Sequence, residues 1–221
     1  MEKVYDFFFT LFSPFCHQIT ERSFQSFDGY QFFVCSRDTG TYLGFLLSYT
    51  LYFYNKSLFR LPIIPIVILF FVHLLVFGLD GVSSYAGWRE TNNLIRYFTG
   101  FYLGFFLGIV FQYVEFFLFK PSNISYNFNK NEYFYKTFML ELYCSLLFTV
   151  TFVSIPYLLY LTAFAIIFYV YKIVKLVLNV LFMLNRGFYY YVAFFLVFVI
   201  FFVSIFITGI YKINVVHKLY H

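Results

Sequence analysis

Long apolar runs, separated by short polar segments, dominate this chain. The runs predict a first membrane span over about 39–54, a second over 61–79, a third over 99–119 and a last one over 188–211. A helix needs about 20 predominantly apolar residues to cross a bilayer. Because the first run is shorter than that, we expect this span to tilt or to start in a local depression of the membrane.

The run over 138–171 is too long for a single upright span, since each residue adds only about 1.5 Å to a helix. It is interrupted once, at Ser154-Ile155-Pro156. Two interpretations stay open: one kinked and tilted helix, or two spans joined by a tight turn. The pattern therefore predicts an all-α, polytopic bundle of transmembrane helices, with about five spans or else six.

The segment before the first span has a different character. Residues 1–38 are rich in aromatic residues, turns and charges, and we expect an irregular interfacial segment there. The apolar stretch 7–15 is too short to cross, so we expect it to lie along the membrane surface. Residues 39–119 then form a core of three transmembrane helices with a polar loop over 80–98, and 120–221 form the carboxy-terminal membrane helices.

Composition supports the membrane assignment. Hydrophobic residues make up 62% of the 221 residues and charged residues 11%, with a mean hydropathy of +0.78. Soluble domains are about one quarter charged. We therefore expect a multi-pass integral protein of the cell membrane whose main partner is the lipid bilayer. The net charge of +5 is scattered over short loops, which is typical of loops between spans and does not indicate a nucleic-acid partner.

Two polar segments are expected to meet at one membrane face. The first two spans form a hairpin, so the segment that ends before the first span and the segment that follows the second emerge on the same side. The ionisable and polar residues of both segments are candidates for one shared pocket: Cys16, His17, Arg22, Cys35, Arg37, Asp38, Asp80, Arg89, Glu90, Asn92 and Arg96.

Small residues recur at the starts of the first and third spans. Residues 39–45 and 99–105 are identical at six of seven positions, which is compatible with a parallel duplication of helix pairs. Glycines four residues apart let helix backbones approach closely. These strips predict that spans one and three pack together, or alternatively that they form a homodimer face: Gly40 and Gly44, and Gly100, Gly104 and Gly108.

The first polar segment offers a set of metal ligands. Cys16, His17, Cys35 and Asp38 supply two thiolates, an imidazole and a carboxylate. Such donors suit zinc or another divalent transition metal such as iron(II). Two alternatives remain open. Cys16 and Cys35 form a disulfide if this face is extracytoplasmic, or both are simply buried thiols.

The second polar segment supplies charges of both signs. Asp80, Arg89, Glu90 and Arg96 lie close together in the sequence. They form either an ion-pair network or a site for a phosphate or carboxylate, which arginine binds through paired hydrogen bonds. His73 precedes Asp80 by about two helical turns, so it is expected to line the same pocket at a deeper level. These five residues are the catalytic candidates.

Two further ionisable groups lie within or near apolar runs. Glu115 and Glu141 are expected towards the opposite membrane face, where their side chains would reach the headgroups. Cys144 is expected to contribute to the packing of the helices.

The motifs resemble a known family. The resemblance is to the domain-of-unknown-function 2085 family of small predicted membrane proteins, over about residues 14–108. It is carried by Cys16-His17-Gln18, Arg22-Ser23-Phe24, Gly29, Cys35-x-Arg37 and Thr39-Gly40-x-Tyr42-Leu43-Gly44, followed by Asp80-Gly81, Arg89, Asn92 or Asn93, Arg96 and Thr99-Gly100. The resemblance implies a site of three cysteines and a histidine that looks like zinc ligation. Asp38 stands where the family has its third cysteine, which leaves no Cys-x-x-Cys redox pair here.

Three functions are compatible with these features, and the sequence does not decide whether the protein is an enzyme. The first is a metal-supported polar pocket at one membrane interface that acts on a lipid or another phosphorylated amphiphile. The second is an ion or metal transporter in which His73 and Asp80 bind the ion in turn as it passes from the pocket into the bundle. The third is a noncatalytic scaffold or assembly protein in which the metal or a disulfide joins the amino-terminal segment to the first span.

Overall fold

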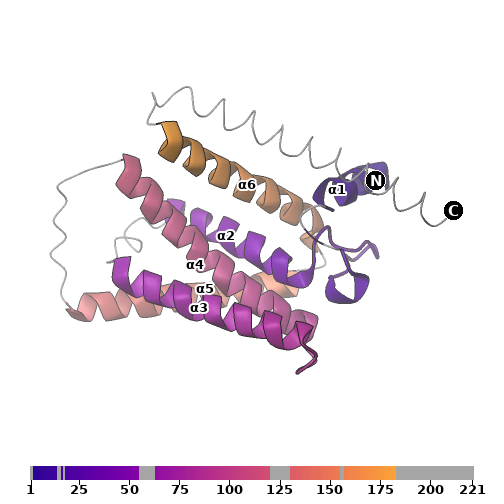
Figure 1. The fold of residues 1–221 in the computed structure, drawn as a ribbon, viewed down its shortest axis with the longest axis horizontal. Helices are drawn as coiled ribbons and strands as arrows, with labels where there is room; N and C mark the ends of the chain where they lie inside the picture. Colours follow the sequence, from indigo (N-terminus) through magenta and orange to yellow (C-terminus); the bar gives the residue numbers. More distant parts are fainter. Residues whose placement is uncertain are drawn as a thin grey trace.

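The fold is all-helical throughout the part of the chain that the computed structural model describes, which comprises residues 2–13, 16, 18–54, 63–119, 130–154 and 157–182. The elements in chain order are α1 (Glu2–Phe12), the short 3₁₀ helix η1 (Thr20–Arg22), α2 (Ser36–Tyr54), α3 (Ile63–Tyr85), α4 (Asn93–Phe119), α5 (Lys130–Ser154) and α6 (Leu159–Phe182). Figure 1 shows α2 to α6 running roughly alongside one another, with α1 at one end of the bundle.

Helix α4 is the centre of the bundle. It packs against α2, α3 and α5, and α2 also packs against α6. Its residues Tyr97, Phe101, Phe105 and Ile109 recur every fourth position, which places them on one face, and all four are fully buried. Of its most apolar stretch, 61% is buried, against 11% for α3. The core is therefore built around α4, while α3 lies at the edge.

Glycines join α2 to α4 at very short range. A side-chain carbon on Gly44 would overlap the Phe101 carbonyl of α4, and one on Gly100 would overlap the Arg37 carbonyl of α2. Gly40 and Gly104 lie against the opposite backbone in the same way. The prediction that the helices of the first and third expected spans pack on each other is confirmed. A homodimer through the same strips stays a prediction.

The helices reach further into the polar segments than the sequence suggests. The polar loop was expected over 80–98, but α3 continues to Tyr85 and α4 begins at Asn93. Asp80 and Arg96 thus lie on helices and not in a loop. Helices α3 and α4 extend beyond the apolar sequence, because the polar side chains at these helix ends contact partners inside the protein.

The long apolar run over 138–171 is resolved as two helices. Helix α5 ends at Ser154 and α6 begins at Leu159. Pro156 falls between them in the sequence, and proline neither continues a helix nor favours a helical residue before it. Three described helices are long and apolar enough to cross a membrane, over 64–85, 93–115 and 159–178. The expected last span over 188–211 lies outside the described residues, so the total of five or six stays a prediction.

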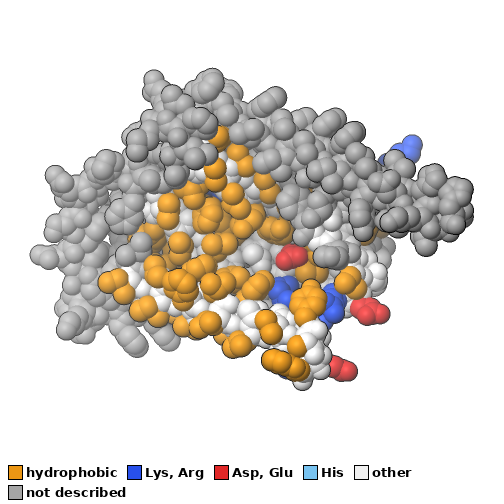
Figure 2. All heavy atoms as spheres, in the orientation of Figure 1, with side chains coloured by type: hydrophobic (Ala, Val, Ile, Leu, Met, Phe, Trp, Pro, Cys, Tyr) orange, Lys and Arg blue, Asp and Glu red, His pale blue; other side chains and the backbone are white. Residues whose placement is uncertain are grey.

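The outer face of α3 is apolar and exposed. Figure 2 shows hydrophobic side chains covering this side of the bundle, while charged side chains gather towards one end. The exposed aliphatic residues and phenylalanine of α3 are Ile64, Ile68, Phe71, Val72, Leu74, Leu75, Val76, Leu79 and Val82. A row of this kind is compatible with lipid and not with water. The fold class, a helical membrane bundle, is confirmed.

Helix α1 covers one end of this bundle. Phe8 and Phe12 stack on each other, and both contact the ring of Phe33, whereas Val4 and Phe7 are exposed. The helix therefore has one face against the protein and one apolar face outside it, as a helix on a membrane surface requires. The division of the chain into three parts stays a prediction.

Candidate functional site

The segment between α1 and α2 lies across the end of the bundle and is held there by hydrogen bonds and aromatic packing. Gln18 donates hydrogen bonds from Nε2 to the carbonyls of Phe9 and Phe33, at 2.6 and 2.9 Å. Phe24 packs edge-on against Tyr97 of α4, with 5.6 Å between ring centroids. These contacts hold the segment in place, so that Cys16 lies beside the first residues of α2.

Cys16, Cys35 and Asp38 form one cluster. The Cys35 N–H donates to Cys16 Sγ at 3.1 Å, and Cys35 Sγ donates to Asp38 Oδ2 at 3.1 Å. Their candidate ligand atoms all lie within 4.8 Å of one another. Cys35 and Asp38 are three residues apart at the start of α2, which places them on the same side of its first turn. We call these three residues the sulfur cluster; His17 lies outside the described residues.

The two thiols of this cluster are not equivalent. Both are free in the structure. The pKa of Cys16 lies below its usual value because hydrogen bonding with Cys35 stabilises its thiolate. The same interaction, together with burial, raises the pKa of Cys35. Cys16 is therefore the more easily ionised of the pair.

The sulfur cluster fits a zinc ion chemically. Zinc is bound by thiolate sulfur and carboxylate oxygen, and sites with three protein ligands leave a position open for water or substrate. Cys16, Cys35 and Asp38 supply three such ligands, and His17, the fourth expected ligand, lies outside the described residues. An ion held there would polarise a bound oxygen or phosphoryl group.

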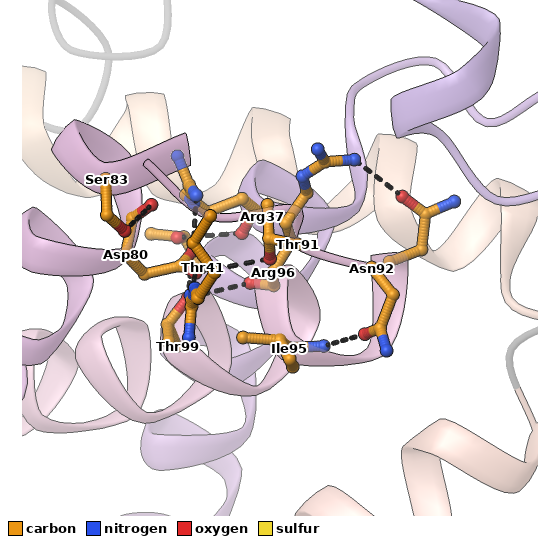
Figure 3. A network of polar contacts seen from close by, with 11 residues as sticks. Arg37, Thr41, Asp80, Ser83, Thr91, Asn92, Ile95, Arg96 and Thr99 are labelled. Atoms are coloured by element: carbon orange, nitrogen blue, oxygen red, sulfur yellow. Dashed lines mark hydrogen bonds and ion pairs between the residues drawn. The ribbon is translucent and has the colours of Figure 1, made fainter. Parts of the chain in front are cut away.

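A second cluster is centred on Asp80 of α3, which is almost completely buried. Its carboxylate pairs with Arg37 of α2 and with Arg89 of the α3–α4 loop. It also accepts hydrogen bonds from the hydroxyls of Thr91 and Thr99, at 3.2 and 3.4 Å (Figure 3). Both carboxylate oxygens are occupied, so Asp80 acts as an anchor for the two arginines.

A cavity of about 180 Å³ lies beside both clusters. It is lined by the sulfur cluster, by three arginines and by residues of α3: Cys16, Ile19, Arg22, Cys35, Arg37, Asp38, Phe77, Ser84, Tyr85 and Arg96. The expectation that the two polar segments meet is confirmed. Ile19, Phe77, Ser84 and Tyr85 were not among the expected pocket residues. For the last three, the signal was their spacing from Asp80 on an extended α3, which the expected loop over 80–98 concealed.

The three arginines of the cavity are held differently. Arg37 pairs with Asp80, and its guanidinium lies over the Phe77 ring, 5.4 Å from the centroid. Arg22 lies over the Tyr85 ring at 4.9 Å. Arg96 donates from Nη1 to Asn93 Oδ1 at 3.2 Å. Among the described residues, neither Arg22 nor Arg96 forms an ion pair with a carboxylate.

The remaining candidates of the α3–α4 loop have other positions. Glu90 is exposed and does not line the cavity. Asn92 is also exposed, and its Oδ1 accepts the Ile95 N–H at 2.9 Å, which caps the start of α4. The charged segment therefore contributes Arg96 to the cavity and Arg89 to the Asp80 cluster.

His73 does not line the cavity. Its Nε2 lies 3.3 Å from Glu141 Oε1 of α5, and its ring stacks on Phe106 with 4.8 Å between centroids. Tyr102 also packs on the imidazole. The expected position of His73 in the pocket is corrected: at this depth the space beside α4 is filled by aromatic rings, and the nearest polar partner comes from α5.

Glu115 is paired inside the bundle as well. Its carboxylate lies 3.1 Å from Lys172 Nζ and 3.9 Å from Lys175 Nζ, both on α6. Tyr49 of α2 donates to the same carboxylate at 3.5 Å. Glu115 and Glu141 thus differ from the expectation that their side chains reach the headgroups. An unpaired charge among apolar helices is costly, so partners on distant helices replace water.

Comparison with known proteins places these features in a family. The family model described as "Predicted membrane protein (DUF2085)" matches residues 16–110. An uncharacterized protein of Methanothermobacter thermautotrophicus is 36% identical over 102 residues, which is 45% of this chain and 86% of the relative. The chain belongs to the DUF2085 family. All residues that line the cavity of this DUF2085 protein lie within the matched range.

A second archaeal relative matches the same part of the DUF2085 protein. An uncharacterized protein of Methanocaldococcus jannaschii is 35% identical over 99 residues, or 44% of this chain. The match spans 61% of that relative, less than two thirds of its length. No solved structure matches the chain.

Proposed function

We propose that this protein is a multi-pass protein of the cell membrane that binds the anionic headgroup of a lipid or another phosphorylated amphiphile. The headgroup would occupy the cavity, beside a zinc ion or another divalent transition metal held by Cys16, Cys35 and Asp38. One observation carries this proposal. One cavity at the end of an apolar bundle brings three side chains that could bind a metal together with three guanidinium groups.

The arginines supply the recognition of the anion. A guanidinium binds phosphate or carboxylate through two parallel hydrogen bonds and is more weakly hydrated than an ammonium group. Arg37 also has a spare donor: its Nε is buried and lacks an acceptor within the part of the chain that the structure describes. A buried donor without a partner is costly, and an anion in the cavity would satisfy it.

Exposed aromatic residues support a position at the headgroup level. Tyr85 and Trp88 follow the lipid-compatible face of α3 and are 72% and 78% exposed. Tyr157, between α5 and α6, is 73% exposed and stacks on Phe27 of the segment between α1 and α2. Tyrosine and tryptophan are enriched where a membrane meets water. The cavity lies at the same end of the bundle.

The two alternative functions, transporter and scaffold, require different structural features. A transporter needs polar groups that continue from the cavity into the bundle, whereas His73 pairs with Glu141 and Asp80 is occupied by Arg37 and Arg89. No described contact therefore favours transport. A scaffold needs only that the sulfur cluster joins the amino-terminal segment to α2, and the test below separates that role from ligand binding.

The test is metal content by mass spectrometry on the detergent-purified full chain. Wild-type protein and Cys144→Ala, whose cysteine is buried away from the cluster, are expected to carry near-stoichiometric zinc or iron. Cys16→Ala and Cys35→Ala are expected to lose it while still eluting as a single folded species. Absence of metal from the wild type, or retention in both variants, contradicts the metal part. If the cysteine variants only lower the yield of folded protein and neither they nor the wild type bind anionic headgroups, the scaffold role replaces the proposal.

A further inference from the structure

The cavity and its surroundings carry more positive than negative charge. Arg37 and Arg89 share the single carboxylate of Asp80. Arg22 and Arg96 line the cavity, and among the described residues Asp38 is the one carboxylate in the lining. In the described part of the chain, the cavity and the adjoining Asp80 cluster thus hold four guanidinium groups and two carboxylates, a surplus of two positive charges. Glu21 and Glu90 are exposed and lie outside the lining.

Binding of zinc would not change this surplus. The ion brings two positive charges, and the two thiols each lose one proton when they become its ligands. The anion that neutralises the site therefore carries two negative charges whether or not the metal is bound. A phosphomonoester carries about −1.5 to −2 at pH 7, whereas a phosphodiester carries one charge.

The size of the cavity limits what can enter. Pockets that enclose a whole drug-sized ligand have volumes of about 300–1,000 Å³. A cavity of about 180 Å³ has room for a small headgroup, so the rest of an amphiphile must lie outside it.

Helix α3 connects the cavity to the apolar surface. Phe77, Ser84 and Tyr85 line the cavity, while Leu79 and Val82 in the same turns are exposed on the apolar face. Only the width of one helix therefore separates the arginines from the surface that faces lipid. Figure 2 shows the charged side chains directly at the end of the hydrophobic area.

We propose that the preferred ligand is a lipid phosphomonoester, whose phosphate lies between Arg22 and Arg96 and whose chains lie along the exposed face of α3. This inference rests on the proposed function and narrows its ligand class. Arg22 and Arg96 have no carboxylate partner among the described residues, so they are the two charges that a dianion neutralises. Arg37 adds a hydrogen bond but shares its charge with Asp80.

The test is competition for the detergent-purified full chain, read by native mass spectrometry. Dioleoyl phosphatidic acid and dioleoyl phosphatidylglycerol have the same chains but present a phosphomonoester and a phosphodiester. We expect phosphatidic acid to bind about tenfold more tightly, as one additional charge-assisted contact implies. Arg22→Gln and Arg96→Gln are each expected to remove most of this preference. Lys3→Gln, which removes an exposed charge on α1 outside the cavity, is expected to keep it.

Glycerol 3-phosphate and inorganic phosphate test the source of the phosphate. Neither is expected to displace phosphatidic acid at comparable concentration, because neither has chains to lie along α3. Displacement by either would overturn the lipid assignment in favour of a soluble phosphomonoester. Equal binding of the two lipids would overturn the inference and leave the proposed headgroup binding intact. Failure of both lipids to bind the wild type would overturn both proposals.

Discussion

Arg37 and Asp80 form an ion pair between α2 and α3, across 43 positions of sequence. The pair is buried, with 11% of the arginine side chain and 3% of the aspartate side chain exposed. It fixes the start of α2, which carries the sulfur cluster, to the end of α3, which borders the cavity. One carboxylate therefore links these two parts directly.

Replacing that carboxylate is expected to destabilise the protein strongly. Asp80→Asn leaves the buried Arg37 without its counter-charge, and breaking one side of a buried pair costs about 3–5 kcal/mol. Arg89→Gln removes a partner that is 47% exposed, for which about 0–1 kcal/mol is expected. Thermal unfolding of both variants in the same detergent measures the difference. Equal shifts in midpoint would contradict the anchoring role of Asp80.

The close contact of α2 and α4 predicts a position-specific effect of added methyl groups. Gly44→Ala places a carbon on the Phe101 carbonyl, so the helices must separate, at a cost of about 1–3 kcal/mol. Gly78→Ala on α3 has open space around the new carbon and should be neutral or stabilising, because alanine favours helix by about 1 kcal/mol over glycine. The unfolding midpoint should fall in Gly44→Ala and should stay the same or rise in Gly78→Ala. A loss of stability in Gly78→Ala as large as that in Gly44→Ala would refute the packing argument.

The membrane bundle and the meeting of the polar segments were predictable from the sequence for a topological reason. Two consecutive spans form a hairpin that returns the chain to the membrane face from which it entered. This holds whatever the rotation of each helix about its own axis. The cysteine and arginine segments therefore had to meet at one end. The glycine strips likewise predicted which helices touch, because a strip of small residues indicates a close neighbour.

The pairing of charges was not predictable in the same way. Asp80 pairs with Arg37 from another helix as well as with the nearby Arg89, and His73 pairs with Glu141 of α5. Such partners depend on how each helix is rotated and how far it slides along its neighbour, and neither is encoded in local spacing. The extension of α3 to Tyr85 was missed because partners elsewhere in the fold stabilise its polar last turns.

The pair between Glu115 and Lys172 predicts compensation between two variants. Glu115→Gln leaves the Lys172 ammonium, 12% exposed and packed over the Tyr49 ring, without its carboxylate. Lys172→Met alone leaves the carboxylate with the Tyr49 hydroxyl and the more distant Lys175 as partners. The double variant removes both charges and should unfold closer to the wild type than the sum of the single effects, with a coupling of about 0.5–3 kcal/mol. Additive losses would show that this pair does not link α4 to α6.

The position of Asp38 predicts how tightly the proposed zinc ion is held. Zinc is a borderline-soft ion that binds thiolate well, and the resemblance noted from the sequence motifs implies a cysteine where this chain has Asp38. Asp38→Cys is therefore expected to slow the loss of metal to a chelator, and Asp38→Ala to speed it. Alkylation of Cys16 and Cys35, followed by peptide mass spectrometry, should report the loss, while the buried Cys144 stays protected throughout. Identical rates of metal loss in wild type, Asp38→Cys and Asp38→Ala would mean that Asp38 is not a ligand, and that the carboxylate serves only to accept the hydrogen bond of Cys35.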